Sequence, residues 1–241
     1  MKPYYSNDLV TLYHADCRQM PLKEMCPDVL ITDPVWPNCP EGLLQGSDNP
    51  ELLFLYMWSR FAPKMPARAV IVMRADSDPR FLSVIPRDLP FFRAQVLPYA
   101  VPGFIGRKLG GMEMAYIYGK PIKSAKGRRV IPGMAPAAQP KQTRFEHPCV
   151  RPVSHFEWLL NWNTDEGESV LDPFAGTGTA LLAGMKLRRR CVGIEIEEKY
   201  CEIAATRLEE IGNVYRDWET DRKSTRLNSS HEIPSRMPSS A

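Results

Sequence analysis

Residues that could do chemistry on a base follow a short apolar run near the N-terminus. Asp33, Pro34 and Trp36 come directly after Val29-Leu30-Ile31-Thr32, which has the composition of a buried strand. The Asp33 carboxylate and the Pro34 carbonyl could accept hydrogen bonds from the two protons of an exocyclic amine. These hydrogen bonds would localise the lone pair of the amine nitrogen and aim it at an electrophile. The aromatic plane of Trp36 could stack on a base that has left its helix. We therefore interpret Asp33, Pro34 and Trp36 as candidate catalytic residues.

A second segment, Asp172-Pro173-Phe174-Ala175-Gly176-Thr177-Gly178-Thr179, follows another apolar run far downstream. The turn at Gly176 to Gly178 allows the backbone to approach a ligand closely, and a helix that begins near Thr179 would point its amide groups at the same place. Glu195 ends the next predicted strand, at the spacing from which an acidic side chain accepts hydrogen bonds from ribose hydroxyls. A dinucleotide fingerprint would have a third glycine where Leu181 stands. The pattern favours a nucleoside cofactor over NAD.

The elements that would position these segments alternate along the chain. Apolar, β-branched runs bounded by turn residues predict strands at Val10–His14, Val29–Thr32, Ala69–Met73, Ala94–Tyr99, Met114–Tyr118, Val170–Leu171 and Val192–Ile196. Helical periods predict helices at Glu51–Phe61, Val153–Trp162, Thr179–Leu187 and Glu198–Ile211. This alternation favours a single α/β domain with a mostly parallel sheet covered on both faces. Such sheets bind ligands at the carboxyl ends of their strands, where both segments lie.

The bulk composition is that of a globular protein and argues against several classes. The chain has 241 residues, of which 44% are hydrophobic, and a formal net charge of +3. No apolar run reaches the roughly 20 residues that cross a bilayer, and the first residues lack the apolar core of a signal peptide, so we expect a cytoplasmic protein with no membrane partner. The six cysteines form no C-x-x-C pair and no ligand cluster with the four histidines, so we expect no metal site.

The two segments together resemble those of the amino-group DNA methyltransferases that use S-adenosylmethionine, over roughly residues 8 to 212. Asp33-Pro34-Val35-Trp36 is similar to their catalytic Asp-Pro-Pro-Tyr motif, and the glycine segment is similar to their cofactor motif. The catalytic motif comes first, as in the β group of the family, whose sheet is assembled from a permuted chain. The resemblance implies a Rossmann-like methyltransferase fold with a mostly parallel seven-stranded sheet and helices on both faces.

The resemblance also implies roles around the cofactor. Asp172 and Phe174 would lie beside the methionine moiety, Glu195 would take the ribose, and Ile196 would pack on the adenine. Asp16-Cys17 resembles a Gly-Asp-Cys element whose carboxylate accepts from the adenine amine, and residues 147–152 resemble a His-Pro-Thr-Gln-Lys-Pro segment that precedes the cofactor strand. The implied cofactor-binding residues are Asp16, Cys17, Asp172, Phe174, Gly176, Thr177, Gly178, Thr179, Glu195 and Ile196.

Two positions of the catalytic motif depart from the family's pattern. Val35 stands for Pro, for which we expect altered loop geometry, and Trp36 stands for Tyr, which keeps the stacking plane. An Asp at the head of the motif favours adenine N6, because the enzymes that act on cytosine N4 more often carry Ser there. The expected activity is site-specific methyl transfer to adenine N6 in DNA. Cytosine N4, an RNA base, a small-molecule substrate and a catalytically weakened nucleic-acid-binding relative are the alternatives.

A basic stretch lies where the β group places target recognition. From Met114 to Phe145 the chain has seven Lys or Arg and no Asp or Glu, and residues of about 120–146 would form a short recognition insertion. Its cations could contact the phosphates of double-stranded DNA. Its short length implies limited sequence readout or help from a second subunit, with which a homodimer would agree. The candidate nucleic-acid-binding residues are Lys123, Lys126, Arg128, Arg129, Lys141 and Arg144.

The last residues differ in character from the rest. From 217 to 241 Ser, Arg, Asn and Pro dominate and no core-forming period continues, so we expect a methyltransferase domain over 1–216 and a disordered tail. Residues 221–231 also resemble a conceptual translation of sequencing-adapter DNA. We therefore expect the tail to be non-native, with a natural disordered tail as the alternative.

Overall fold

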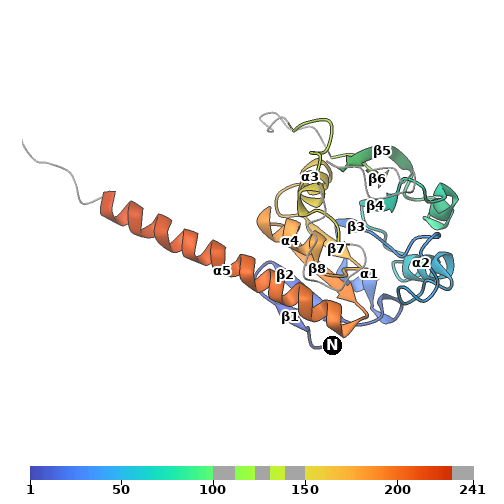
Figure 1. Cartoon of the computed structure of the whole chain (residues 1–241), viewed down its shortest axis with the longest axis horizontal. Helices are drawn as coiled ribbons and strands as arrows, with labels where there is room; N and C mark the ends of the chain where they lie inside the picture. The colour runs from blue at the N-terminus through green and yellow to red at the C-terminus, as the bar shows by residue number, and fades with distance from the viewer. Residues whose placement is uncertain (100–111, 123–130, 139–149, 230–241) are drawn as a thin grey trace, which may run out of the picture.

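The computed structural model describes residues 1–99, 112–122, 131–138 and 150–229, with the backbone alone from 214 onward. Figure 1 shows an α/β body from which one long helix projects. Its strands form one eight-stranded sheet in the order β1-β2-β8-β7-β3-β4-β6-β5. The strands are β1 (Tyr5–Ser6), β2 (Val10–His14), β3 (Val29–Thr32), β4 (Arg68–Arg74), β5 (Phe91–Pro98), β6 (Met112–Gly119), β7 (Ser169–Asp172) and β8 (Arg190–Glu195).

All seven predicted strands are present, but the sheet has eight strands instead of the expected seven. The extra strand, β1, is a two-residue edge strand that pairs antiparallel with β2, and so short a segment has no periodicity that a sequence pattern could reveal. The five strands from β2 to β4 in the sheet order are parallel to one another. The last two, β6 and β5, are added antiparallel at the far edge.

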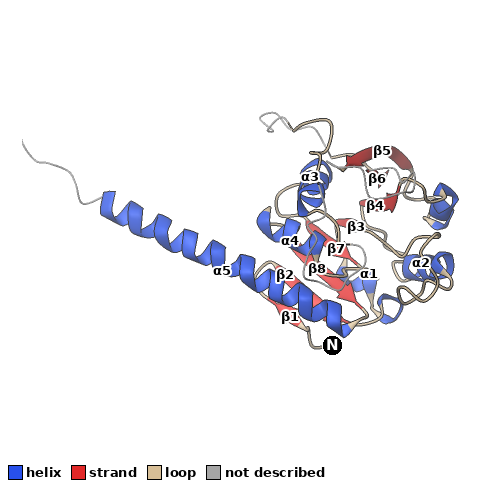
Figure 2. Ribbon diagram, viewed as in Figure 1, coloured by secondary structure: helices blue, strands red, loops and turns tan. Residues whose placement is uncertain are grey.

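Helices cover both faces of the sheet, as Figure 2 shows. The α-helices are α1 (Leu22–Met25), α2 (Pro50–Ser59), α3 (Val153–Asn163), α4 (Thr179–Lys186) and α5 (Glu198–Ser229), with short 3-10 helices at Cys17–Gln19 and Pro79–Val84. The start of α2 is set locally, because the Asn49 side chain accepts a hydrogen bond of 3.0 Å from the Leu52 amide and Pro50 stands at the first helical turn.

The strand residues divide between two cores according to the two-residue period of a strand. Ile31 and Val70 pack in one core with residues of α3, α4 and the first part of α5. Their neighbours Leu30 and Ile71 point to the other face and pack with α2 and the two 3-10 helices. Because both faces are covered, the central strands are apolar throughout rather than alternating with polar residues.

The order of strands places the two candidate segments side by side. From β3 the chain runs through α2 to β4, and from β7 it runs through α4 to β8, on the opposite side. Since β3 and β7 are neighbours, the strand order reverses between them, and a crevice forms outside their carboxyl ends. Asp33 follows β3 directly, and Asp172 is the last residue of β7.

The segment predicted as a tail from 217 begins within a helix. Helix α5 runs to Ser229, well beyond the predicted end at Ile211. Leu208 is the last buried residue of α5 among those whose side chains are described. A formed helix can propagate through a segment without a core-forming period, because each added residue gains a backbone hydrogen bond. The boundary near 216 stays a prediction, and 230–241 lie outside the described residues.

Part of the predicted recognition insertion is attached to α3. The Pro132 carbonyl accepts hydrogen bonds from the indole N–H groups of Trp158, at 2.8 Å, and Trp162, at 2.9 Å. Ala138 bridges to Tyr99 beyond β5. All six candidate nucleic-acid-binding residues lie outside the described part of the chain. Among the helices described, none is both long and apolar enough to cross a bilayer.

Candidate active site

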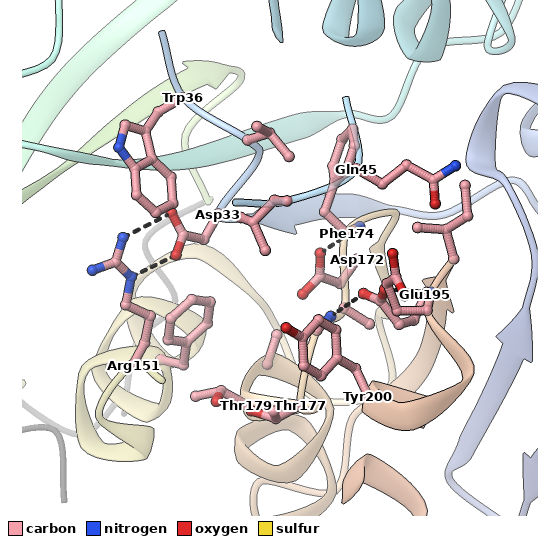
Figure 3. A pocket seen from close by; sticks show the side chains of 18 residues that line it. Asp33, Trp36, Gln45, Arg151, Asp172, Phe174, Thr177, Thr179, Glu195 and Tyr200 are labelled. Carbon is pink, nitrogen blue, oxygen red and sulfur yellow. Dashed lines mark hydrogen bonds and ion pairs between the residues drawn. The ribbon is translucent and has the colours of Figure 1, made fainter. Parts of the chain in front are cut away.

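A cavity of about 750 Å³, partly open to solvent, lies at the carboxyl ends of β3, β7 and β8. Both segments singled out in the sequence contribute to it, although they are far apart in the chain. Figure 3 shows Asp33 and Arg151 on one side of this cavity and Asp172 and Glu195 on the other. Residues that line it include Asp33, Val35, Trp36, Gln45, Arg151, Asp172, Phe174, Gly176, Thr177, Thr179, Glu195, Ile196, Glu197 and Tyr200.

The Asp33 carboxylate is held by Arg151, the residue before Pro152 and α3. The Nε atom of Arg151 donates to Oδ2 of Asp33 at 2.5 Å, and Nη2 donates to Oδ1 at 3.2 Å. The same guanidinium donates through Nη1 to Glu113 on β6. From the sequence, Arg151 belongs only to a segment that precedes the cofactor strand, and Glu113 has no predicted role. The signals available for them were an arginine next to a helix start and an acidic residue in an apolar strand.

Trp36 lies inside the protein rather than presenting an open face. It is 3% exposed and packs with Val35, Cys39 and Leu53. Its ring centroid is 5.3 Å from Cζ of Arg151, a distance at which the guanidinium interacts with the ring. Val35 is also buried in this cluster, where an apolar side chain without hydrogen-bonding groups is accommodated. Stacking of a base on Trp36 would therefore require the neighbouring side chains to move.

Asp172 is a buried acid at the centre of the site. Its Oδ1 accepts hydrogen bonds from the Thr32 hydroxyl, at 2.7 Å, and from the Phe174 amide, at 3.1 Å. Burial raises the pKa of Asp172 to about 7; these hydrogen bonds partly oppose the shift, and the negative charges of Asp33 and Glu195 add to it. In a cavity that stabilises the neutral form of a carboxyl group, binding of a cationic ligand is favourable, because the positive charge stabilises the ionised carboxylate.

The glycine turn adopts the backbone geometry that its sequence predicts. Gly176 and Gly178 have φ angles of +51° and +76°, a region that side-chain-bearing residues rarely adopt. The Gly176 amide donates to Oε2 of Glu195 at 2.7 Å, and the Glu197 amide donates to Oε1 at 2.8 Å. Glu195 thus joins the turn after β7 to the end of β8. Burial raises the pKa of its carboxyl above the ordinary value.

A smaller cavity of about 350 Å³ adjoins the first and shares Gln45, Phe174, Glu195 and Ile196 with it. Asp16 and Cys17 line this second cavity, so the early segment meets the late one. The Asp16 carboxylate accepts from the backbone amide of Arg18 at 2.9 Å and from its guanidinium at distances down to 2.7 Å. Burial raises the pKa of the Cys17 thiol to about 12, so this residue is a neutral part of the wall.

Nearly all of the sequence-predicted site residues that the structure describes lie around these two cavities. Gly178 is the exception among the cofactor residues, because it faces Ala204 of α5 instead of lining either cavity. Pro34, a predicted catalytic residue, is buried and is not among the residues that line either cavity. Within the described ranges no group of three or more His, Cys, Asp or Glu residues could hold a metal ion.

The sheet is mostly parallel, and a glycine turn and an acidic residue lie at neighbouring strand ends. This arrangement is typical of the α/β proteins that bind a nucleotide or nucleoside at their switch point. Comparison with known families makes the assignment specific. The model of the N6/N4 DNA methylase family matches residues 19–206. The chain therefore belongs to this DNA methylase family.

Curated relatives match over short segments. The type II methyltransferase M2.DpnII of Streptococcus pneumoniae is 41% identical over 64 residues, which cover 27% of this chain and 24% of that protein. The type II methyltransferase M2.MboI of Moraxella bovis is 32% identical over 77 residues, which cover 32% of this chain and 28% of that protein. The matches thus span about a quarter of the length of these relatives.

Solved structures resemble the chain over most of its length. The M1.HpyAVI complex with S-adenosylmethionine superposes with a TM-score of 0.64 at 24% identity, over 83% of this chain and 99% of that one. The cytosine-N4-specific PvuII DNA methyltransferase superposes with a TM-score of 0.63 at 16% identity, over 89% of this chain and 94% of that one. These likenesses show that the fold is that of DNA methyltransferases.

Proposed function

We propose that this chain transfers a methyl group from S-adenosylmethionine to the exocyclic N6 amine of adenine in DNA, within the cytoplasm. One observation carries the proposal: Asp33 and the glycine turn line the same cavity, although 139 positions separate Asp33 from Asp172 in the sequence. The family membership of the chain supports the reaction class. The Asp that heads the catalytic motif supports adenine as the base.

The cavity suits a cationic nucleoside cofactor. Its lining holds four carboxylates and one guanidinium, and the latter is already paired with Asp33; the acidic residues are Asp33, Asp172, Glu195 and Glu197. Excess negative charge in a half-closed cavity attracts a sulfonium cation. Glu195 would hold the ribose, Phe174 and Ile196 would provide apolar contact, and Asp16 at the smaller cavity would face the adenine amine. When bound, S-adenosylmethionine supplies an electrophilic methyl group.

The residues on the other side of the cavity activate the nucleophile. Asp33 and the Pro34 carbonyl would accept hydrogen bonds from the two N–H groups of the base amine. The lone pair of the nitrogen then leaves conjugation with the ring and points across the cavity. The nitrogen would then form its new bond to the methyl carbon while the carbon–sulfur bond breaks and its electron pair goes to sulfur, which leaves as a neutral thioether, and one proton of the methylated nitrogen would be lost to solvent. Catalysis of this kind consists of positioning and electrostatic stabilisation, with no covalent enzyme intermediate.

We expect Gly178→Ala to weaken cofactor binding about tenfold and to destabilise the fold by about 1–2 kcal/mol. The new Cβ would lie 2.9 Å from Cβ of Ala204, at a φ of +76° that alanine rarely adopts, so the turn must shift. Gly167→Ala is the matched control, because Gly167 has a φ of +84° and nothing within 4 Å of the added Cβ. Calorimetric titration and thermal unfolding measure both effects. Equal cofactor affinities in the two variants would contradict the prediction.

The basic stretch is proposed to contact double-stranded DNA. We expect the double variant Arg128→Ala/Arg129→Ala to bind DNA more weakly and to reduce the slope of log affinity against log salt by about 2, because each lost phosphate contact releases about one counterion fewer. Arg80→Ala/Arg87→Ala, which removes the same charge from an exposed region outside the stretch, serves as control. Fluorescence anisotropy measures the binding of a short duplex at several salt concentrations and gives the slopes. Identical slopes for wild type and the first variant would refute the contact.

One experiment tests the reaction and the base together. The protein is incubated with methyl-labelled S-adenosylmethionine and unmethylated bacterial DNA, and the DNA is then digested to nucleosides. Label in N6-methyladenine supports the proposal, whereas label in N4-methylcytosine assigns the other amine, a candidate that the likeness to PvuII methyltransferase keeps in view. Absence of label in both, together with retained DNA binding, would indicate a non-catalytic relative. Sedimentation of the active protein tests the proposed homodimer.

A further inference from the structure

Four polar side chains from separate parts of the chain form one connected network beside the cavity. Arg151 donates to both oxygens of Asp33, and its Nη1 donates to Oε1 of Glu113. The Tyr99 hydroxyl donates to the same Glu113 oxygen at 2.5 Å and lies 3.4 Å from Nη1 of Arg151. The guanidinium is therefore the point that joins a carboxylate in the catalytic segment to a carboxylate on the antiparallel part of the sheet.

The network is costly to bury. The side chains of Arg151, Asp33 and Glu113 are 10%, 14% and 2% exposed, and one positive charge serves two negative ones. Buried ion pairs of this kind contribute little net stability, because desolvation of the charges offsets their attraction. Glu113 Oε2 is buried and has no hydrogen-bond partner among the described residues. A gain in stability does not account for such an arrangement, whereas a fixed geometry at Asp33 does.

Of the three charged residues in the network, only Glu113 lies within a helix or strand. Asp33 follows β3 in a stretch without helix or strand. Glu113 belongs to β6, which pairs along its length with β4 and β5, and Arg151 immediately precedes Pro152, the N-cap of α3. Figure 3 shows the Arg151 side chain extending to the outer side of Asp33, away from Asp172. A carboxylate offers about four lone-pair positions, so two remain after the Arg151 hydrogen bonds.

We propose that Arg151 is a positioning residue for methyl transfer, with Glu113 fixing Arg151 in turn. The guanidinium holds the Asp33 carboxylate in one rotamer and as a hydrogen-bond acceptor, so that its remaining lone pairs meet the amine of the base. Arg151 itself does not touch the reacting atoms. This inference rests on the proposed function and adds the residue on which the geometry of its catalytic carboxylate depends.

The test replaces the planar, two-pronged donor by a point charge. We expect Arg151→Lys to lower the single-turnover rate of methyl transfer to DNA about 100-fold, since lysine keeps the charge but cannot hold both oxygens, and a displacement of about 1 Å costs that much. The dissociation constants for S-adenosylmethionine and DNA should change less than threefold. Arg80→Lys is the matched control, because Arg80 also donates through Nε and a terminal nitrogen to one carboxylate, that of Asp78, but at the exposed surface. Its rate should equal that of wild type.

Two further variants separate positioning from a purely structural effect. Glu113→Gln should lower the same rate by about tenfold, with unchanged binding of cofactor and DNA, because Arg151 loses its charged anchor but keeps an acceptor. Arg151→Ala should recover part of its lost rate in millimolar guanidinium chloride, which supplies the missing fork, while Asp33→Ala should recover none.

Certain results would overturn the proposal. A wild-type rate of methyl transfer in Arg151→Lys would overturn it. A rate above wild type would also overturn it, because the ion pair would then inhibit the reaction. A loss confined to binding constants, or no recovery of Arg151→Ala by guanidinium in a folded protein, would also overturn it. Failure here is distinguishable from failure of the proposed function, since the latter requires that the wild-type protein itself methylates no DNA. Circular dichroism of each variant establishes that it is folded.

Discussion

Asp33→Asn is expected to lower the single-turnover rate of methyl transfer by about 10³-fold while the affinity for S-adenosylmethionine changes less than threefold. The asparagine has the same shape, but one of its acceptor oxygens becomes an N–H donor, which would face the donors of Arg151 or of the base amine. Loss of one preorganised electrostatic contact to a reacting group costs about 10² to 10³ in rate. The loss of one of the two counterions of Arg151 also changes the hydrogen bonds that orient residue 33, because only Glu113 still pairs with the guanidinium.

Methyl-labelled cofactor with unmethylated DNA measures this rate, and calorimetric titration measures cofactor binding separately. Asp78→Asn is the matched control, since Asp78 is bound by Arg80 in the same two-pronged manner at an exposed position. We expect it to have the wild-type rate. If Asp33→Asn retained more than a tenth of wild-type activity, Asp33 would not be the group that activates the amine, whatever the reaction turned out to be.

The free energy of unfolding without ligand is expected to depend on pH through Asp172. Its pKa is raised from 3.8 to about 7 in the folded protein, chiefly by burial. Between these two values the folded protein holds a proton on Asp172 that the unfolded chain has lost, so the contribution of this group to stability is fully present below pH 4 and declines as the pH rises through 7. Three pKa units correspond to about 4 kcal/mol, an upper bound for the effect.

Asp172→Asn removes this titration with little change in contacts. Oδ1 of Asp172 accepts both hydrogen bonds, from Thr32 and Phe174, and an amide oxygen can accept the same two. We therefore expect the variant to match wild type at pH 4 and to be more stable than wild type at pH 8, by urea unfolding at each pH. Glu195, whose carboxyl pKa is also raised, contributes a similar slope in both proteins and cancels in the difference. Parallel profiles would contradict the buried acid.

Local patterns in the sequence determined the elements and the chemical types of the two segments. The predicted bounds of β2 and β3 agree with the structure residue for residue, because an apolar β-branched run between turn residues is a short-range signal. The glycine turn was equally local, since positive φ angles at Gly176 and Gly178 follow from the absence of a side chain. The two motifs together indicated the DNA methylase family to which the chain belongs.

Tertiary structure alone decided how these parts meet. Arg151 contacts Asp33 across 118 positions of sequence and Glu113 across 38, and no periodic pattern records such pairs, because they depend on which strands become neighbours and which way each side chain turns. The same holds for Trp36, whose sequence context suggested a stacking surface and whose side chain lies buried beside Arg151. Packing between distant segments buries Asp172, which raises its pKa, and brings Arg151 to Asp33, whose geometry its hydrogen bonds fix.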